Sequence, residues 1–153
     1  MMNEENELID EAESIVAKAW GEDFVPTEKE LEILNQVFNS KHSRIIYLPL
    51  VSLLGLTEGI FVSQLRGMLK YGKSRRVIED HRGKWWAIYN TYDEWLKILP
   101  FCSRISLQRL IRRLEKTEII LSKRTPGGKY YGLNFRALAY FLQNPEKLKK
   151  LLK

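Results

Sequence analysis

The chain has 153 residues, of which 44% are hydrophobic and 11% aromatic, so it can bury a core and is not of disordered composition. The single cysteine, Cys102, excludes an internal disulfide and fits a reducing compartment. No apolar run is long enough to span a membrane, and the acidic N-terminus lacks the basic and then apolar order of a signal peptide, so the sequence predicts a cytoplasmic protein without a membrane partner.

The net charge of +6 conceals a sharp division between two parts of the chain. Residues 1–40 carry eleven acidic residues and two lysines, whereas residues 41–153 carry 23 lysines and arginines and eight acidic residues. A polyanion would be repelled by the first part and attracted by the second. The alternative is that both charges only keep the protein soluble, and charge alone does not separate DNA, RNA and acidic membrane surfaces.

The first 40 residues have the pattern of an acidic helical extension. Apolar residues recur at steps of three and four over residues 4–20, which predicts an amphipathic helix that ends at Gly21. Thr27 and Glu30 have the spacing of a capping box, so a second helix is expected from there to about Asn39. The apolar stripe of the first helix either pairs with its copy in a homodimer, binds another partner or packs on the basic part of the chain. The connector at residues 39–44 is the expected domain boundary.

A basic domain is expected over residues 41–142. The elements predicted in its first half are a strand at Ile45–Leu48, a helix from Thr57 to about Leu69, a charged loop at Tyr71–Gly83, a strand at Lys84–Tyr89 and a helix at Tyr92–Leu99. Gly59 and Gly67 weaken the first helix, which predicts that other elements pack closely on it. Asn90 and Thr91 are expected to cap the second helix. The turn Pro100–Ser103 then leads into a helix from Ser103 to about Lys116.

The second half of this domain has the pattern of a β-hairpin. Residues 119–124 and 129–133 predict two strands, and the turn between them contains Gly127 and Gly128, which can supply positive φ angles. A helix at Phe135–Leu142 and a basic tail at residues 143–153 follow. From residue 57, the order of helix, strand, helix, tight turn, helix and hairpin is that of a winged helix-turn-helix, whose third helix enters the major groove of DNA. We therefore expect a mostly α-helical α+β fold, with a winged helix after the acidic extension.

The predicted helix Ser103–Lys116 has an apolar side and a basic side. Four apolar residues at helical spacing predict the buried side: Leu107, Leu110, Ile111 and Leu114. The opposite side and its margins carry Ile105 and five polar or basic residues: Arg104, Gln108, Arg109, Arg112 and Arg113. Because arginine and glutamine can pair with the edges of guanine and adenine, Gln108, Arg109 and Arg112 are the expected base contacts. Ser103, Arg104 and Ser106, at the helix N-terminus, suit a phosphate, and the alternative is a solvated arginine-rich face without a partner.

Basic and aromatic residues around this helix extend the predicted DNA-binding surface. The hairpin carries Lys123, Arg124 and Lys129, which are expected to lie along a phosphate backbone, the alternative being a basic turn without a partner. The loop at residues 72–83 either touches DNA or is only a connection. Three tryptophans, Trp85, Trp86 and Trp95, are candidates for stacking on unpaired bases, but their strand and helix positions favour packing. Because Trp85 and Trp86 are adjacent in a strand, one of them must point outward.

The sequence shows no pattern of a catalytic, metal or nucleotide site. His42 and His81 are far apart, Cys102 stands alone in a turn, and there is no glycine-rich phosphate loop. We therefore expect a protein that is not an enzyme, needs no cofactor or metal ion, and has double-stranded DNA as its partner.

Seven segments between Gly55 and Asn134 form a recognisable series: Gly55–Leu65, Lys84–Trp85, Tyr89–Trp95, Pro100–Phe101, Ser106–Leu110, Leu114–Glu115 and Lys129–Asn134. Through these segments, in this order, residues 56–134 resemble the N-terminal winged-helix domains of phage and plasmid replication initiators and replisome organisers, the DnaD-like group. The resemblance covers about half of the chain and implies binding to a replication origin or recruitment of replication proteins. A transcriptional regulator on the same fold, or a winged-helix module that binds proteins without binding DNA, are the alternatives.

The sequence departs from this family at two places. The family usually has a glycine after the third helix, where this chain has Thr117 and Glu118. A residue other than glycine is costly in a left-handed cap, so a different turn is expected here. The chain also ends soon after the hairpin, without the helical C-terminal domain through which replisome organisers engage helicase loaders. It is therefore expected to be either a fragment or a protein that acts by DNA binding alone.

Overall fold

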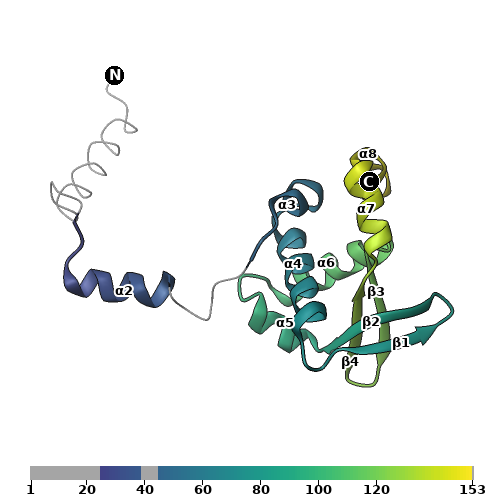
Figure 1. Cartoon of the computed structure of the whole chain (residues 1–153), viewed down its shortest axis with the longest axis horizontal. Helices are drawn as coiled ribbons and strands as arrows, with labels where there is room; N and C mark the ends of the chain where they lie inside the picture. The colour runs from purple at the N-terminus through teal and green to yellow at the C-terminus, as the bar shows by residue number, and fades with distance from the viewer. Residues whose placement is uncertain (1–24, 39–44, 153) are drawn as a thin grey trace. The chain divides into compact units, whose positions relative to one another are not determined.

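The computed structural model describes residues 25–38 and 45–152, and the chain divides into two units, residues 1–43 and 44–153. The described part has an α+β fold with seven helices and a four-stranded antiparallel sheet (Figure 1). In the first unit it contains α2 (Glu28–Phe38), whose start confirms the predicted capping box. The Thr27 N–H donates to Glu30 Oε1 at 2.8 Å, and the Glu30 N–H donates to Thr27 Oγ1 at 3.2 Å. The helix expected over residues 4–20 and the connector at residues 39–44 lie outside the described residues.

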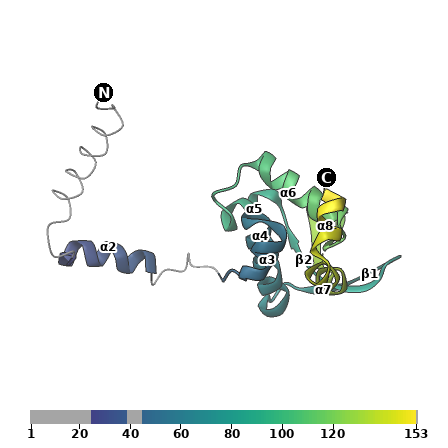
Figure 2. The same cartoon turned by 90° about the horizontal axis from the view of Figure 1, so that it is seen from above.

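The second unit contains the sheet and the remaining helices of the described part. Its elements in order are α3 (Leu48–Leu54), α4 (Leu56–Tyr71), β1 (Arg76–Asp80), β2 (Gly83–Asn90), α5 (Tyr92–Ile98), α6 (Arg104–Lys116), β3 (Ile120–Thr125), β4 (Gly128–Leu133), α7 (Phe135–Gln143) and α8 (Pro145–Leu152). The strand order is β1-β2-β4-β3, so the two hairpins meet where β2 pairs with β4. Figures 1 and 2 show the β1–β2 hairpin projecting beyond the helices.

The main core lies between the helices and one face of the sheet. Because successive strand residues point to opposite faces, Ile88 of β2 and Tyr131 of β4 face the helices, and both are at most 1% exposed. Trp95 of α5 packs against the rings of Phe61 and Tyr131, with centroid distances of 4.3 Å and 5.5 Å. The opposite face of the sheet carries a smaller cluster around Ile78, Trp85 and Ala87. The sheet therefore has two apolar faces, and the first of them packs against α4, α5 and α6.

The structure corrects the expected strand at Ile45–Leu48. Residues 45–47 are irregular, and α3 begins at Leu48 with Pro49 in its first turn. Proline suits this position because the first N–H groups of a helix have no partner within the helix. The helix α3 lies against α4 at Gly59, where an added Cβ would stand 2.9 Å from the Val51 Cα. Close packing is therefore confirmed at Gly59 but not at Gly67, where an added Cβ would meet nothing within 4 Å.

The segment expected as a charged loop at Tyr71–Gly83 contains the strand β1. It pairs with β2 in the register Arg76↔Ala87 to Asp80↔Gly83, and Gly83 makes the turn with a φ of 108°. Only Ile78 of its five residues is buried, and the other four are exposed or half-buried. One buried apolar residue gives too weak a sequence pattern to predict a strand. Pairing with β2, rather than its own pattern, makes this segment a strand.

The C-terminal segment also differs from the expectation. Residues 145–152, expected as part of a basic tail, form α8, and Leu148 is 1% exposed within the main core. In the turn after α6, Glu118 has a left-handed backbone conformation, with a φ of 61°. The expectation of a different turn at this point is therefore wrong: Glu118 occupies the conformation that favours glycine.

Candidate nucleic-acid interface

The helix α6 is held in one orientation by its buried side. The residues Leu107, Leu110, Ile111 and Leu114 are at most 2% exposed, as predicted. Each such side chain stabilises the packed state by about 1.5–3 kcal/mol, so rotation of α6 about its axis would be strongly unfavourable. The Ser103 side chain begins the helix by accepting a hydrogen bond from the Ser106 N–H at 3.1 Å. The side opposite the buried one must therefore face outward.

The outward side of α6 carries the two arginines expected to contact bases. Arg109 and Arg112 are exposed, and within the described part of the chain neither has an ion pair or a hydrogen bond from its side chain. Ile105 is 61% exposed on the same side, and Gln108 is half-buried. This side therefore presents two uncompensated guanidinium groups and one apolar side chain.

The other two arginines of this helix have acidic partners. Arg104 Nη1 lies 2.9 Å from Asp93 Oδ1, and Arg113 Nη1 lies 3.2 Å from Glu58 Oε1. Exposed ion pairs contribute only about 0–1 kcal/mol, so a phosphate could displace Asp93 from the highly exposed pair of Arg104. The Glu58 side chain is only 16% exposed, and its pair with Arg113 joins α6 to the first turn of α4. Arg113 is thus better suited to holding α6 than to contacting a ligand.

The serines at the start of α6 are bonded to one another. In addition to the capping bond, the Ser103 hydroxyl lies 2.9 Å from the Ser106 hydroxyl. Both residues are exposed. The Ser103 oxygen is therefore committed to the helix cap, and Ser106 is the serine that has capacity left for a phosphate.

A groove of about 440 Å³ lies between the starts of α5 and α6 and the β3–β4 turn. It is lined by Arg104, Arg124 and Lys129, so the structure brings together three of the predicted phosphate contacts. Lys123 does not line it. The register pairs Lys123 with Tyr130, whose ring packs with the cluster on the opposite face of the sheet. The predicted hairpin contacts are therefore divided between the two faces.

Lys129 is committed to holding the hairpin against α6. Its Nζ lies 3.2 Å from Glu115 Oε1, and its side chain is only 13% exposed. The Ser122 hydroxyl of β3 also donates to the Glu115 carboxylate. Glu115 therefore connects α6 to both strands of the hairpin, and Lys129 acts as a positioning residue rather than as a free phosphate contact.

The two positions of the hairpin turn that hold glycine require it for different physical reasons. Gly127 has a φ of 87°, whereas Gly128 does not have a positive φ. An added Cβ at Gly128 would stand 2.6 Å from the Tyr89 hydroxyl, so this glycine allows the hairpin to approach β2 closely. The expectation that both glycines supply positive φ angles is thus correct for Gly127 only.

Asn90 lines the groove but was not predicted from the sequence as a residue of the binding surface. It is 5% exposed, and its Nδ2 has no hydrogen-bond partner among the described residues. A buried amide without a partner costs about 1–3 kcal/mol, and this Nδ2 atom has almost no accessible surface, so a ligand in the groove would not reach it. Asn90 was expected to cap α5, but the capping box is made by Thr91 and Glu94. One sequence feature could have identified Asn90 as a groove residue: it is a polar amide at the end of a predicted strand that also contains buried residues.

Two of the three candidate tryptophans are buried in the fold. Trp85 and Trp95 are buried, as their strand and helix positions predicted, and Trp86 is 54% exposed, which confirms that one of the adjacent pair points outward. Burial, together with the nearby Glu58 carboxylate, raises the pKa of the Cys102 thiol, so it is a neutral thiol at pH 7.

Among residues 25–38 and 45–152 no three His, Cys, Asp or Glu side chains gather at a site for a metal ion. Nor does the same part of the chain contain a helix with the length and apolar character to cross a bilayer.

Comparisons with protein-family models, with curated protein sequences and with solved structures found no match to this chain.

Proposed function

We propose that residues 45–152 form a winged helix that binds double-stranded DNA in a sequence-specific manner. The order α4, β2, α5, α6, β3 and β4 is that of a winged helix-turn-helix, and β1 is an addition to it. In this reading α6 is the recognition helix and the β3–β4 hairpin is the wing. The observation that carries the proposal is a pair of arginines, Arg109 and Arg112, that have no acidic partner among residues 25–38 and 45–152 and lie on the outward side of a helix whose other side is buried.

The side chains of α6 have the chemistry that base readout requires. Arg109 and Arg112 would each make paired hydrogen bonds to the O6 and N7 atoms of a guanine, and Gln108 would pair with an adenine. Ile105, which is 61% exposed, suits the methyl group of a thymine. Arg104 and Arg124 in the neighbouring groove would hold the phosphate backbone and thereby set the register of α6 in the major groove.

We further propose that the bound DNA is the replication origin of a phage or plasmid. This part of the proposal is supported by the resemblance of residues 56–134 to the DnaD-like group. A homodimer on a palindromic or repeated site, and replication proteins as further partners, belong to the same proposal. The nearest alternative role is that of a transcriptional regulator on the same fold.

The decisive experiment compares two duplexes at several salt concentrations. The specific duplex is one recovered by selection from a randomised library, and the other has the same composition in scrambled order. The full chain should bind the selected duplex at least about tenfold more tightly, and both affinities should fall as salt rises. Equal affinity for the two duplexes would contradict base readout. Absence of binding at low salt would contradict DNA binding altogether and favour a module that binds proteins.

Substitution of Arg109 tests the assignment of the base contacts. Arg109→Ala should weaken binding to the selected duplex by about 1–3 kcal/mol and binding to the scrambled duplex by much less. Lys147→Ala, on α8, is the matched control, because it removes one exposed positive charge outside α6. If both variants lose the same affinity on both duplexes, Arg109 contributes only charge.

A further inference from the structure

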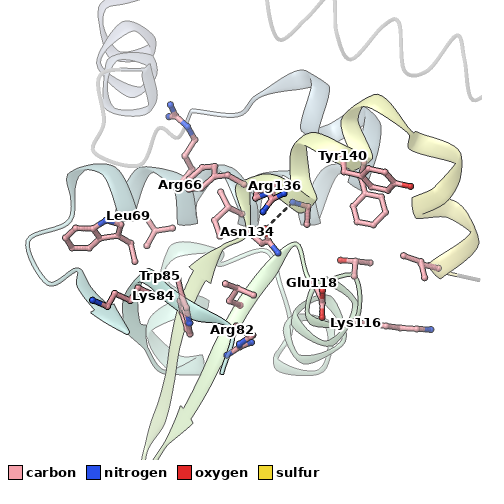
Figure 3. Close-up of a pocket in the computed structure, with 18 of the residues that line it drawn as sticks. Arg66, Leu69, Arg82, Lys84, Trp85, Lys116, Glu118, Asn134, Arg136 and Tyr140 are labelled. Carbon is pink, nitrogen blue, oxygen red and sulfur yellow. Dashed lines mark hydrogen bonds between the residues drawn. The ribbon is translucent and has the colours of Figure 1, made fainter. Parts of the chain in front are cut away.

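A second basic surface lies in an open cleft of about 1220 Å³ between α4, β2, the turn after α6, and α7 (Figure 3). We call it the basic cleft. Six of its lining residues are basic and one is acidic, Glu118; the basic residues are Arg66, Lys70, Arg82, Lys84, Lys116 and Arg136. It shares no lining residue with the groove beside the wing, and Ile105, Arg109 and Arg112 do not line it. The basic cleft is therefore separate from the proposed duplex-binding surface.

Some cations of the basic cleft are already committed to partners within the fold. Arg82 lies 2.7 Å from Asp80 and donates to the Ser122 carbonyl at 2.9 Å, and its hydrogen bond holds the pKa of the Asp80 carboxyl well below the usual range. Arg66 donates to the Tyr47 hydroxyl at 2.9 Å. These two arginines hold the walls of the cleft in place.

Of the other four cations, Lys70 lies 5.2 Å from the centroid of the Tyr71 ring, and three are free to bind an anion. Lys84, Lys116 and Arg136 are exposed, and in the described part of the chain none of them has an ion pair or a hydrogen bond from its side chain. Figure 3 shows that they come from three separate segments around the cleft. Three uncompensated charges repel one another and create a positive potential, which a polyanion would relieve.

Exposed aromatic rings stand beside these cations. Three lining residues have large exposed fractions: Trp86 at 54%, Phe135 at 58% and Tyr140 at 48%. Trp86 points outward because Trp85 occupies the opposite face, packed so closely on Gly132 that an added Cβ there would stand 2.4 Å from the Trp85 ring. The guanidinium of Arg75, which comes directly before β1, lies 5.2 Å from the centroid of the Trp86 ring and supports it. An exposed, supported ring beside free cations is typical of surfaces on which unpaired bases stack.

We infer that the basic cleft binds single-stranded nucleic acid, with phosphates at Lys84, Lys116 and Arg136 and a base stacked on Trp86. Duplex DNA hides the faces of its bases within the stack, so it would leave the Trp86 ring unused. An acidic polypeptide would use the cations but gain little from the face of an indole. Only an unpaired strand uses both features, because it alternates phosphates with exposed base faces.

The test is an anisotropy titration of the full chain with a labelled oligodeoxythymidylate of about 16 nucleotides. Trp86→Thr keeps a strand-forming residue and should weaken binding about 5- to 150-fold, the effect of losing one stacked base. Trp86→Tyr keeps an aromatic ring and should bind like the wild type or nearly so. Combined Lys84→Ala and Arg136→Ala should reduce the slope of log K against log salt by about 1.4, since each lost phosphate contact on a single strand reduces it by about 0.7.

Two controls separate this inference from the proposed duplex binding. Arg109→Ala should bind the oligonucleotide normally while losing affinity for the selected duplex. A polyglutamate of matched length should displace the oligonucleotide poorly. The inference is overturned if Trp86→Thr binds the oligonucleotide as tightly as wild type does. It is equally overturned if polyglutamate competes at equal charge concentration, because the cleft would then be a general anion surface suited to acidic polypeptides.

Discussion

The contact between α3 and α4 can be tested with two glycines of the same helix. Gly59 and Gly67 both lie within α4, so alanine at either position gains about 1 kcal/mol of helix propensity. At Gly67 an added Cβ meets nothing within 4 Å, so Gly67→Ala should stabilise the protein by about that amount. At Gly59 the added Cβ would lie 2.9 Å from Val51 Cα and 3.0 Å from Val51 N, both backbone atoms of α3.

The expected magnitude follows from the distance between these atoms. Carbon atoms in ordinary contact are about 3.5–4.0 Å apart, so α3 must move by roughly half an ångström or more to admit the new methyl group. Overpacking of this kind costs about 1–3 kcal/mol. Because the propensity gain is common to both variants, the difference between their free energies of unfolding should equal this cost.

Thermal and urea unfolding of both variants measure this difference. One kcal/mol corresponds to about 3–5 °C in a unit of this size, so Gly67→Ala should melt roughly 3–15 °C above Gly59→Ala. If the two variants differ by less than about 0.5 kcal/mol, α3 does not rest on Gly59, and the packing of α3 described above is wrong.

Two further predictions concern the residues that join α6 to the hairpin. Glu118→Gly should raise the free energy of unfolding by about 0.5–1 kcal/mol, because Glu118 has a φ of 61° and glycine adopts this conformation without strain. The control Glu118→Ala removes the same charge but keeps the Cβ, and an equal gain in both variants would show that charge rather than backbone strain is responsible. Glu115→Ala should release Lys129, steepen the salt dependence of duplex binding by up to about 0.9 in log–log slope, and reduce the preference for the selected duplex. An unchanged slope in a salt titration would mean that Lys129 is not held by Glu115.

The features that the sequence determined by itself depend on neighbours a few residues apart. The spacing of Leu107, Leu110, Ile111 and Leu114 established which side of α6 is buried, and therefore which arginines face outward. The capping box at Thr27 could be predicted in full, and the one at Thr91 in part, because the donor and acceptor residues of a capping box are only three positions apart. The β3–β4 hairpin likewise follows from one short turn.

Other features depended on partners that are distant in the chain. The strand β1 exists because β2 pairs with it, and residues 145–152 form part of the domain because Leu148 is buried in its core. Site residues show the same dependence: a basic pattern could not reveal that Glu115 engages Lys129 or that Glu58 engages Arg113. Such pairings are set by which elements the fold brings together. Tertiary structure alone therefore decided which of the predicted cations are free to meet a ligand, and it alone assembled the basic cleft from α4, β2, the turn after α6, and α7.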